Sequence, residues 1–211
     1  SGVGESTHDW QSRSGNSRKR FFFTRKSLQK KGQNFINDYV AYTLESTKCI
    51  GLKVINAGGS EFFKNGGEVF NLDDVVPSYG VSSREILKTL NIANEELKIK
   101  HPLHVHCNNL GIPGNIDTIV ETINSAEGRR MHLAHVQFYA YSKKGKKGFS
   151  SGSLDLAEAV NSNKNITVDV GQVMFNPTVT ISSDILRQFS ARKNANPKKW
   201  VISEVEDGGG G

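Results

Sequence analysis

Lysine and histidine side chains stand near the carboxyl-terminal ends of three short apolar segments of this chain. The segments are 51–55, 101–109 and 132–138, and the side chains are those of Lys53, His106 and His135. Imidazole nitrogens are common ligands of divalent metal ions. Because parallel strands place their carboxyl ends at one edge of a sheet, the three side chains are expected to lie in one ring. This pattern favours a metal-dependent hydrolase.

The apolar pattern alternates between helix and strand along the chain. Apolar residues recur at helical spacing over 34–44, 83–97, 116–123, 154–160 and 185–189. Apolar runs typical of buried strands cover 49–56, 102–107, 131–138 and 166–174. The alternation predicts βαβ units and a parallel sheet of four strands. Ser82 or Ser83 is expected to cap the second helix, and long loops are expected at 58–79 and 142–152.

The positive charge of the chain is confined to its first residues. The formal net charge is +6, and residues 1–31 hold eight Lys and Arg residues against two acidic ones. Such a block is expected to be a disordered basic tail, with the folded unit at 32–211. Basic residues beside the aromatic cluster 21–23 would suit single-stranded nucleic acid. No nucleic-acid-binding signature accompanies them, so nucleic acid is not expected as a partner.

Cysteine use and hydropathy indicate a cytoplasmic protein. Cys49 and Cys107 are too few for a disulfide framework and lie in apolar segments. They are expected to be small buried hydrophobic residues in a reducing compartment. No run of 18 apolar residues and no secretory signal are found in the sequence, so no membrane association is expected.

Lys53 is unusual because a lysine within an apolar strand is buried as a charge, which is costly unless the charge is paired. Its amine either reaches the rim of the fold or reacts with CO2. The resulting carbamate is an anion with two oxygens that suits two divalent metal ions. His104 and His106 alternate with Val105 and so share one strand face. A lone histidine there is more often structural, so the prediction depends on the combination.

Taken together, these segments resemble the amidohydrolase superfamily of metal-dependent TIM barrels. Within it they are similar to the A subunits of formylmethanofuran dehydrogenase and of the related formyltransferase/hydrolase complex. The resemblance covers about residues 34–211 and is carried by LKVINAGG, HPLHVHCNNLGIPGNIDT, HLAHVQFYAYS, ITVDVGQVMF and NPKKWVISEVEDGGGG. It implies a partial (β/α)8 barrel of the α/β class, roughly strands 4–7 with their helices.

The resemblance also implies a site and a reaction. Two zinc ions would be bridged by a carboxylated Lys53 and a hydroxide, with His106 and His135 as further ligands. Residues implied to orient ligands or substrate are His104, Asn108, Asn109 and Gln137. A zinc-bound hydroxide would hydrolyse the formamide bond of N-formylmethanofuran, or the reverse reaction would form it, in one-carbon metabolism such as methanogenesis. The implied partners are the other subunits of the complex and a methanofuran-type carrier.

Some positions of the family pattern have no counterpart. The only histidine before Lys53 is His8, and no strand that could carry the family's catalytic Asp follows before Gly211. Asp169 is expected to be a hydrogen-bonded strand or rim residue. His132 is expected to point to the other face or to the strand entrance, as a structural or exposed residue. The isolated chain is therefore expected to be an inactive fragment that binds one zinc ion or none. The alternative is a non-catalytic relative that serves in assembly or carrier binding.

Overall fold

The centre of the fold is a parallel sheet of four strands. A computed structural model describes residues 25–59, 62, 69–77, 79–145, 148 and 150–170, with the backbone alone for 25–31. The strands in sheet order are β1 (Lys53–Ile55), β4 (Leu103–His106), β5 (Met131–Leu133) and β8 (Ile166–Val168). Within this sheet, β1 pairs in parallel with β4, β4 with β5, and β5 with β8. The predicted four-stranded parallel sheet is therefore confirmed.

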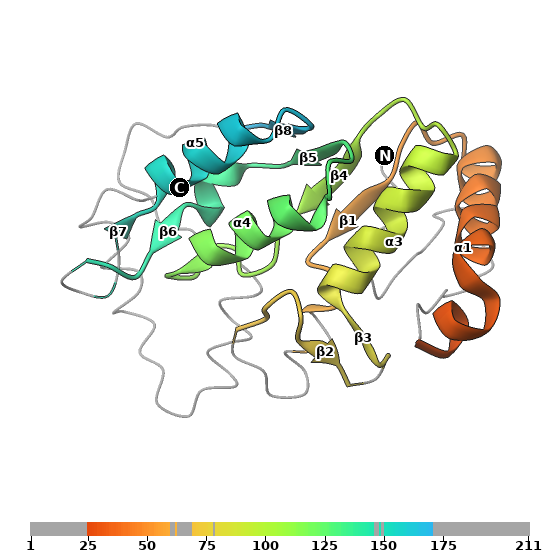
Figure 1. Cartoon of the computed structure of the whole chain (residues 1–211), viewed down its shortest axis with the longest axis horizontal. Helices are drawn as coiled ribbons and strands as arrows, with labels where there is room; N and C mark the ends of the chain where they lie inside the picture. The colour runs from red at the N-terminus through yellow and green to blue at the C-terminus, as the bar shows by residue number, and fades with distance from the viewer. Residues whose placement is uncertain are drawn as a thin grey trace.

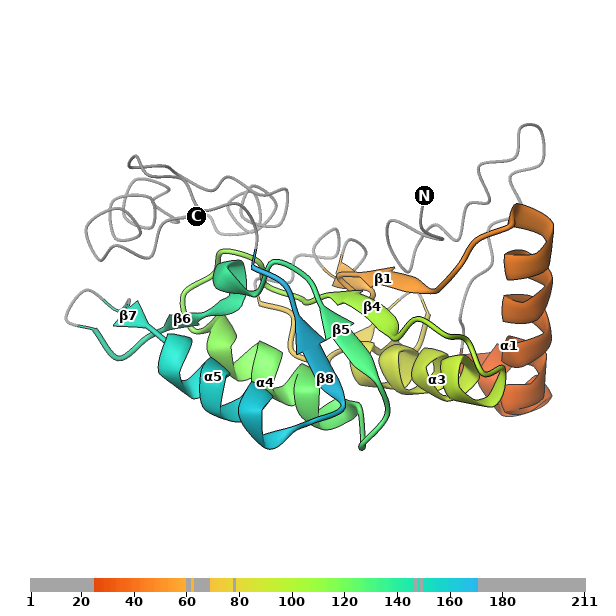
Figure 2. The same cartoon turned by 90° about the horizontal axis from the view of Figure 1, so that it is seen from above.

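Three helices connect these strands and lie along the same face of the sheet (Figures 1 and 2). They are α3 (Ser83–Glu96), α4 (Asn115–Ser125) and α5 (Ser153–Ser162). In a doubly wound sheet the strand order reverses and helices cover both faces. Here the order is sequential and the connecting helices share one face, so the described sheet is singly wound.

The two faces of the sheet carry different side chains, because successive residues of a strand point to opposite sides. The row that joins the hydrophobic core consists of Val54, Val105 and Leu133. These side chains are at most 3% exposed and belong to the same core as buried side chains of α3 and α4. The adjacent row contains Lys53, His104 and His132, which are only partly buried. One face therefore builds the core, while the other holds titratable groups.

The helix α1 (Arg25–Thr47) packs beside α3 at the β1 end of the sheet (Figure 1). Its side chains Ile36 and Val40 are completely buried in the core. Gly32 kinks the helix with φ 66° and ψ −175°, a conformation that is essentially restricted to glycine. No helix in the part of the chain that the structure describes is long and apolar enough to cross a membrane.

The helix predicted from residue 34 is present, but helical backbone already begins at Arg25. The last residues of the segment 1–31 are thus helical where irregular chain was expected. Residues 28–31 are good helix formers, so local propensity accounts for turns that the apolar pattern does not indicate. The described residues do not include 1–24 and 171–211. The end of the expected last strand and the expected last helix fall in the second of these ranges.

Three details of the predicted connections differ from the structure. The expected loop 58–79 contains β2 (Val75–Val76), which pairs with β3 (Val81–Ser82). The expected loop 142–152 contains most of a second antiparallel pair, β6 (Tyr141–Ser142) and β7 (Ser150–Ser151). The predicted strand 131–138 is wrong beyond Leu133, because a short 3-10 helix, η1 (Val136–Tyr139), follows. All three differences involve pieces too short for periodicity to reveal.

The two cysteines are both free. Cys107 is 3% exposed, and burial raises the pKa of its thiol to about 12. A hydrogen bond with Thr122 acts in the opposite direction, but its effect on the pKa is smaller. Cys107 is therefore the small buried residue that the sequence predicts, whereas Cys49 is only partly buried.

The start of α3 gives a direct test of local stability. The Ser82 side chain accepts a hydrogen bond from the Glu85 backbone N–H, and the Glu85 carboxylate accepts one from the Ser82 N–H. Ser82→Ala removes half of this capping box and should lower the free energy of unfolding by about 1 kcal/mol. Urea denaturation measures the change. The control Ser162→Ala, at an exposed position at the end of α5, should change it by less than about 0.5 kcal/mol.

Candidate metal centre

Four histidine rings form a continuous row across the face of the sheet that α3, α4 and α5 leave open. The ring centroids of His132 and His104 are 5.1 Å apart, those of His104 and His106 are 5.3 Å apart, and those of His106 and His135 are 4.3 Å apart. β4 supplies the two central rings, and β5 and the turn after it supply the outer ones. Lys53 on β1 lies beside His104 in the register. The sheet thus carries the predicted side chains on one face, with Lys53 at the start of β1, two register positions before His106.

His106 and His135 make the closest contact in the row. The distance from His106 Nδ1 to His135 Nε2 is 2.9 Å, so one ring N–H donates a hydrogen bond to the lone pair of the other. Two nitrogens bound to one tetrahedral zinc ion at about 2.0 Å would be about 3.3 Å apart. The two atoms therefore lie almost at the separation of ligands that share a metal ion.

The position of the His135 ring depends on an unusual turn. His135 has φ 37° and ψ 55°, in the left-handed region that is strained for residues other than glycine. If β5 continued past Leu133, strict alternation would place His135 on the face of the helices. The strand ends at Leu133, and the turn directs the imidazole towards His106 instead.

Asp169, directly after β8, holds this turn in place. Its Oδ1 accepts the His135 backbone N–H at 2.6 Å, and its Oδ2 lies 3.0 Å from His132 Nε2. Its backbone N–H donates to Leu133 O, and its carbonyl accepts from the Val136 N–H. Asp169 is therefore a hydrogen-bonded residue at a strand end, close to the sequence expectation.

The expected orientation of His132 towards the other face is wrong, whereas its hydrogen bonds agree with the expected structural role. His132 Nδ1 contacts Thr167 Oγ1 at 2.9 Å and Nε2 contacts Asp169, so the ring lies in the same row as His104. The error follows from treating 131–138 as one strand, in which residues three apart point to opposite faces. Asp169, just after the neighbouring strand β8, is the residue in the sequence that could have indicated a partner for His132.

Burial lowers the pKa of His106 to about 3, and the charges of His135 and Lys53 act in the same direction. The pKa values of His104 and His135 are also lowered, in each case mainly by burial. All three rings are consequently neutral at pH 7, the form in which imidazole binds a metal. For Asp169, burial raises the pKa, but hydrogen bonds from the His135 backbone and His132 outweigh it and the net pKa is lowered.

The donor set fits zinc only if Lys53 takes part. His104 Nε2 and His135 Nδ1 are buried and have no hydrogen-bond partner, and imidazole is a ligand that zinc favours. In the part of the chain that the structure describes, however, no three His, Cys, Asp or Glu side chains converge as a metal site. His106 and His135 therefore need a third ligand of another kind.

The predicted orienting residues after β4 serve the neighbouring loop. The Asn108 amide donates to Ser83 Oγ at 3.0 Å. Asn109 brackets Phe70 by accepting its backbone N–H and donating to its carbonyl, both at 3.0 Å, and also donates to Thr118. Both side chains are at most 3% exposed. They anchor the segment around Phe70 to α3 and α4, while Gln137 lies partly buried in η1.

The parallel sheet with its connecting helices defines a protein of the α/β class, and one face of the sheet carries a lysine and a row of histidines. No family model matches the chain. Over 185 residues the chain is 50% identical to the A subunit of the formyltransferase/hydrolase complex Fhc of Methylorubrum extorquens, covering 85% of this chain and 34% of the relative. Over 179 residues it is 36% identical to protein FwdA of Methanocaldococcus jannaschii, covering 80% of this chain and 31% of the relative.

A solved structure gives the same result. The crystal structure of the formyltransferase/hydrolase complex FhcABCD from Methylorubrum extorquens, in complex with methylofuran, matches with a TM-score of 0.69 and 49% identity. The match covers 82% of this chain and 32% of that chain. The present chain is thus homologous to a segment of the A subunit of this complex, which confirms the predicted resemblance to these A subunits. It spans about a third of the length of the curated relatives it matches.

The lowered histidine pKa values predict a pH-dependent stability of the metal-free chain. Unfolded histidine has a pKa of about 6.5, so below that pH the unfolded state binds more protons than the folded state. The free energy of unfolding should therefore fall as the pH drops from about 6.5 towards the folded pKa of His106, about 3. Urea denaturation at pH 7.5 and pH 5.0 with a chelator tests this above the carboxylate range. His106→Asn should reduce the dependence, and equal stabilities of the unsubstituted chain at both pH values would contradict it.

Proposed function

We propose that this chain contributes metal-binding strands to an amidohydrolase subunit that breaks, or in reverse forms, the formamide bond of an N-formylmethanofuran-type carrier. The observation that carries the proposal is the contact of His106 Nδ1 with His135 Nε2 at 2.9 Å, on the sheet face that also carries Lys53. The relative whose crystal structure matches contains methylofuran, which supports a carrier of the same kind. Other subunits of such a complex are the proposed partners.

The proposed complete fold is a (β/α)8 barrel in which β1, β4, β5 and β8 correspond to strands 4–7. Sequential strand order with the connecting helices on one face supports this, because a barrel winds in one direction with its helices outside. In a barrel the face with Lys53 and the histidines would point inwards. The carboxyl ends of the strands are where barrel enzymes place their sites.

The proposed zinc ligands are His106 Nδ1, His135 Nε2 and Lys53 in carboxylated form. In carboxylation the Lys53 ammonium group first loses a proton, and the neutral amine then forms an N–C bond to CO2 and releases a second proton, so that a cation becomes an anionic oxygen ligand. Both histidines are neutral at pH 7, so each can bind a metal ion through a nitrogen lone pair without first losing a proton. When bound, zinc supplies Lewis acidity, which polarises a carbonyl group and makes water more acidic.

The remaining residues of the row position these donors. Asp169 keeps His135 in its strained turn and accepts a hydrogen bond from His132. His104 lies between His132 and His106 with an unpaired ring nitrogen, which can hydrogen bond to a bound molecule. Partners of this kind fix the orientation of ligating side chains and tune a metal site.

The second candidate function is non-catalytic. It is favoured by the lack of three His, Cys, Asp or Glu side chains that could hold a metal ion among the described residues. A relative that only assembles with partner proteins, or only holds the carrier, needs the fold and not the metal. It would keep Asn108 and Asn109 as anchors of the loop and tolerate loss of His106. The experiment below separates the two functions.

The proposed function is tested by replacing the homologous segment of the A subunit from Methylorubrum extorquens with the aligned residues of this chain, in the assembled complex. The chimera should hydrolyse the formyl carrier and contain zinc. His106→Ala or His135→Ala should lower activity by about a hundredfold or more and remove zinc, because each deletes a proposed ligand. Hydrolysis assays and metal analysis of the same sample measure both effects.

His101→Ala is the matched control, since His101 is exposed at the start of the same strand segment and should leave activity and zinc unchanged. A chimera that assembles normally yet lacks zinc and activity would favour the non-catalytic function. The chain itself provides a parallel test by competition titration with a zinc-binding dye. If the unsubstituted chain binds zinc and His135→Ala binds it with equal affinity, the ligand assignment is refuted.

A further inference from the structure

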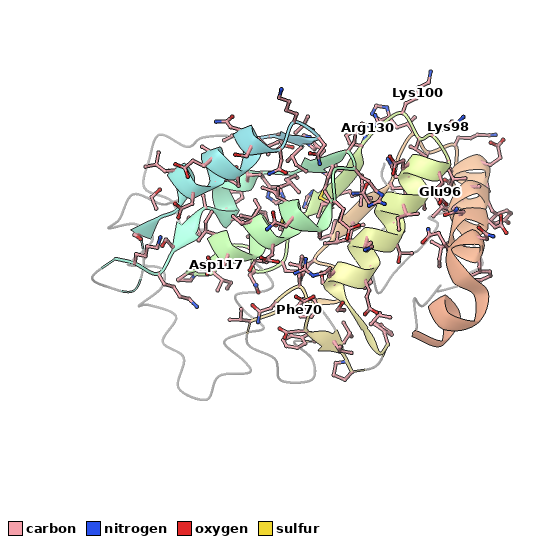
Figure 3. The ribbon with its side chains drawn as sticks, in the orientation of Figure 1. Phe70, Glu96, Lys98, Lys100, Asp117 and Arg130 are labelled. Carbon is pink, nitrogen blue, oxygen red and sulfur yellow. The ribbon has the colours of Figure 1, made fainter. Side chains whose placement is uncertain are left out.

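A second concave site lies at the opposite edge of the sheet, where the strands begin. It is a pocket of about 520 Å³ between the α3–β4 connection and the α4–β5 connection. The residues that line it include Asn91, Asn94, Lys98, Lys100, Arg129 and Arg130. Figure 3 shows Lys98, Lys100 and Arg130 together at the end of α3, away from Phe70 and Asp117. Lys100 and Arg130 precede β4 and β5, so the pocket lies at the opposite ends of these strands from His106 and His135.

The positive charge of this pocket is only partly neutralised. Arg129 forms ion pairs with Glu95 at 3.0 Å and with Glu127 at 3.2 Å. Lys98, Lys100 and Arg130 have no carboxylate partner among the residues that the structure describes. The pocket therefore presents three uncompensated cations to solvent.

Arg130 is fixed in position without being neutralised. Its guanidinium donates to Lys100 O and to Ile99 O, each at 2.7 Å. Backbone carbonyls carry no net charge, so these contacts orient the group while its full charge remains. An arginine held in this way is prepared to bind an anion without loss of side-chain entropy.

The wall of the pocket also contains polar atoms that the fold does not satisfy. Asn91 and Asn94 are 1% and 2% exposed, and Asn91 Nδ2 and Asn94 Oδ1 have no hydrogen-bond partner. The other polar atom of Asn94, Nδ2, donates to His101 O at 3.1 Å. Leaving buried amide atoms unpaired costs free energy. A polar occupant that reaches them, directly or through a water molecule, would remove that cost.

We propose that this pocket binds a small organic molecule through a carboxylate or phosphate group. Its volume lies in the range of small-molecule sites, which is about 300–1,000 Å³. The three uncompensated cations select an anion, and the two asparagines supply hydrogen-bonding groups beside it. Because the site lies at the other edge of the sheet, this inference does not depend on the proposed hydrolytic function.

The test is calorimetric titration of the chain with pyrophosphate and, separately, with citrate, in chloride buffer of constant ionic strength. Saturable binding at one site is expected, and the tighter anion distinguishes a phosphate group from a carboxylate group as the natural ligand chemistry. Lys98→Gln/Lys100→Gln should weaken that binding by about tenfold or more, because each lysine contributes a charged contact. Arg130→Lys keeps the charge but loses the planar fork, and should also weaken it.

The control is Lys48→Gln/Lys164→Gln, which removes two charges at equivalent positions. Lys48 follows α1 with φ 56° as Lys98 follows α3 with φ 53°, and Lys164 is exposed shortly before β8 as Lys100 is before β4. This variant should bind as tightly as the unsubstituted chain. Equal weakening in both double variants, or no saturable binding of either anion, would overturn the proposal. Circular dichroism of each variant confirms that these exposed substitutions leave the fold intact.

Discussion

The alternation of side chains across a parallel sheet is the constraint on which the rest of the structure depends. With α3, α4 and α5 on one face, Val54, Val105 and Leu133 have to face those helices and form the core. The intervening positions must then face the other way, and they are Lys53, His104 and His132. Titratable groups are crowded on that face as a direct result of core formation. Burial also lowers the pKa of His104 and of His106, which keeps these two rings neutral at pH 7.

His135 is the exception to this alternation, and its position has to be maintained by other contacts. A left-handed conformation is unfavourable for histidine, and Asp169 compensates with hydrogen bonds to the backbone and to His132. The contact between His135 and His106 thus depends on a residue in a different strand connection. The contact between His106 and His135 and its support by Asp169 are therefore distributed over β4, the turn after β5 and the residue after β8, so no one of these segments alone could form it.

The sequence allows prediction of features that repeat over many residues, and of little else. The helical spacing of Ile86 and Leu90, and of Ile119 and Ile123, indicates α3 and α4, and the apolar strand runs give the order of the sheet. The turn at His135 could not be foreseen, because one residue in a left-handed conformation leaves no periodic trace. The same holds for the pairing of Asn109 with Phe70, which joins residues 39 apart in the sequence. Long-range polar contacts depend on how the loops close, which the apolar pattern does not encode.

The central claim is that His106 and His135 share one metal ion with a carboxylated Lys53. Anomalous diffraction at the zinc absorption edge, from crystals grown with zinc and bicarbonate, tests it most directly. The account predicts an anomalous peak within bonding distance of His106 Nδ1 and His135 Nε2, together with density for a carboxylate on Lys53 Nζ. An unmodified Lys53 with no peak between the two rings, in a crystal that binds zinc elsewhere, would contradict it.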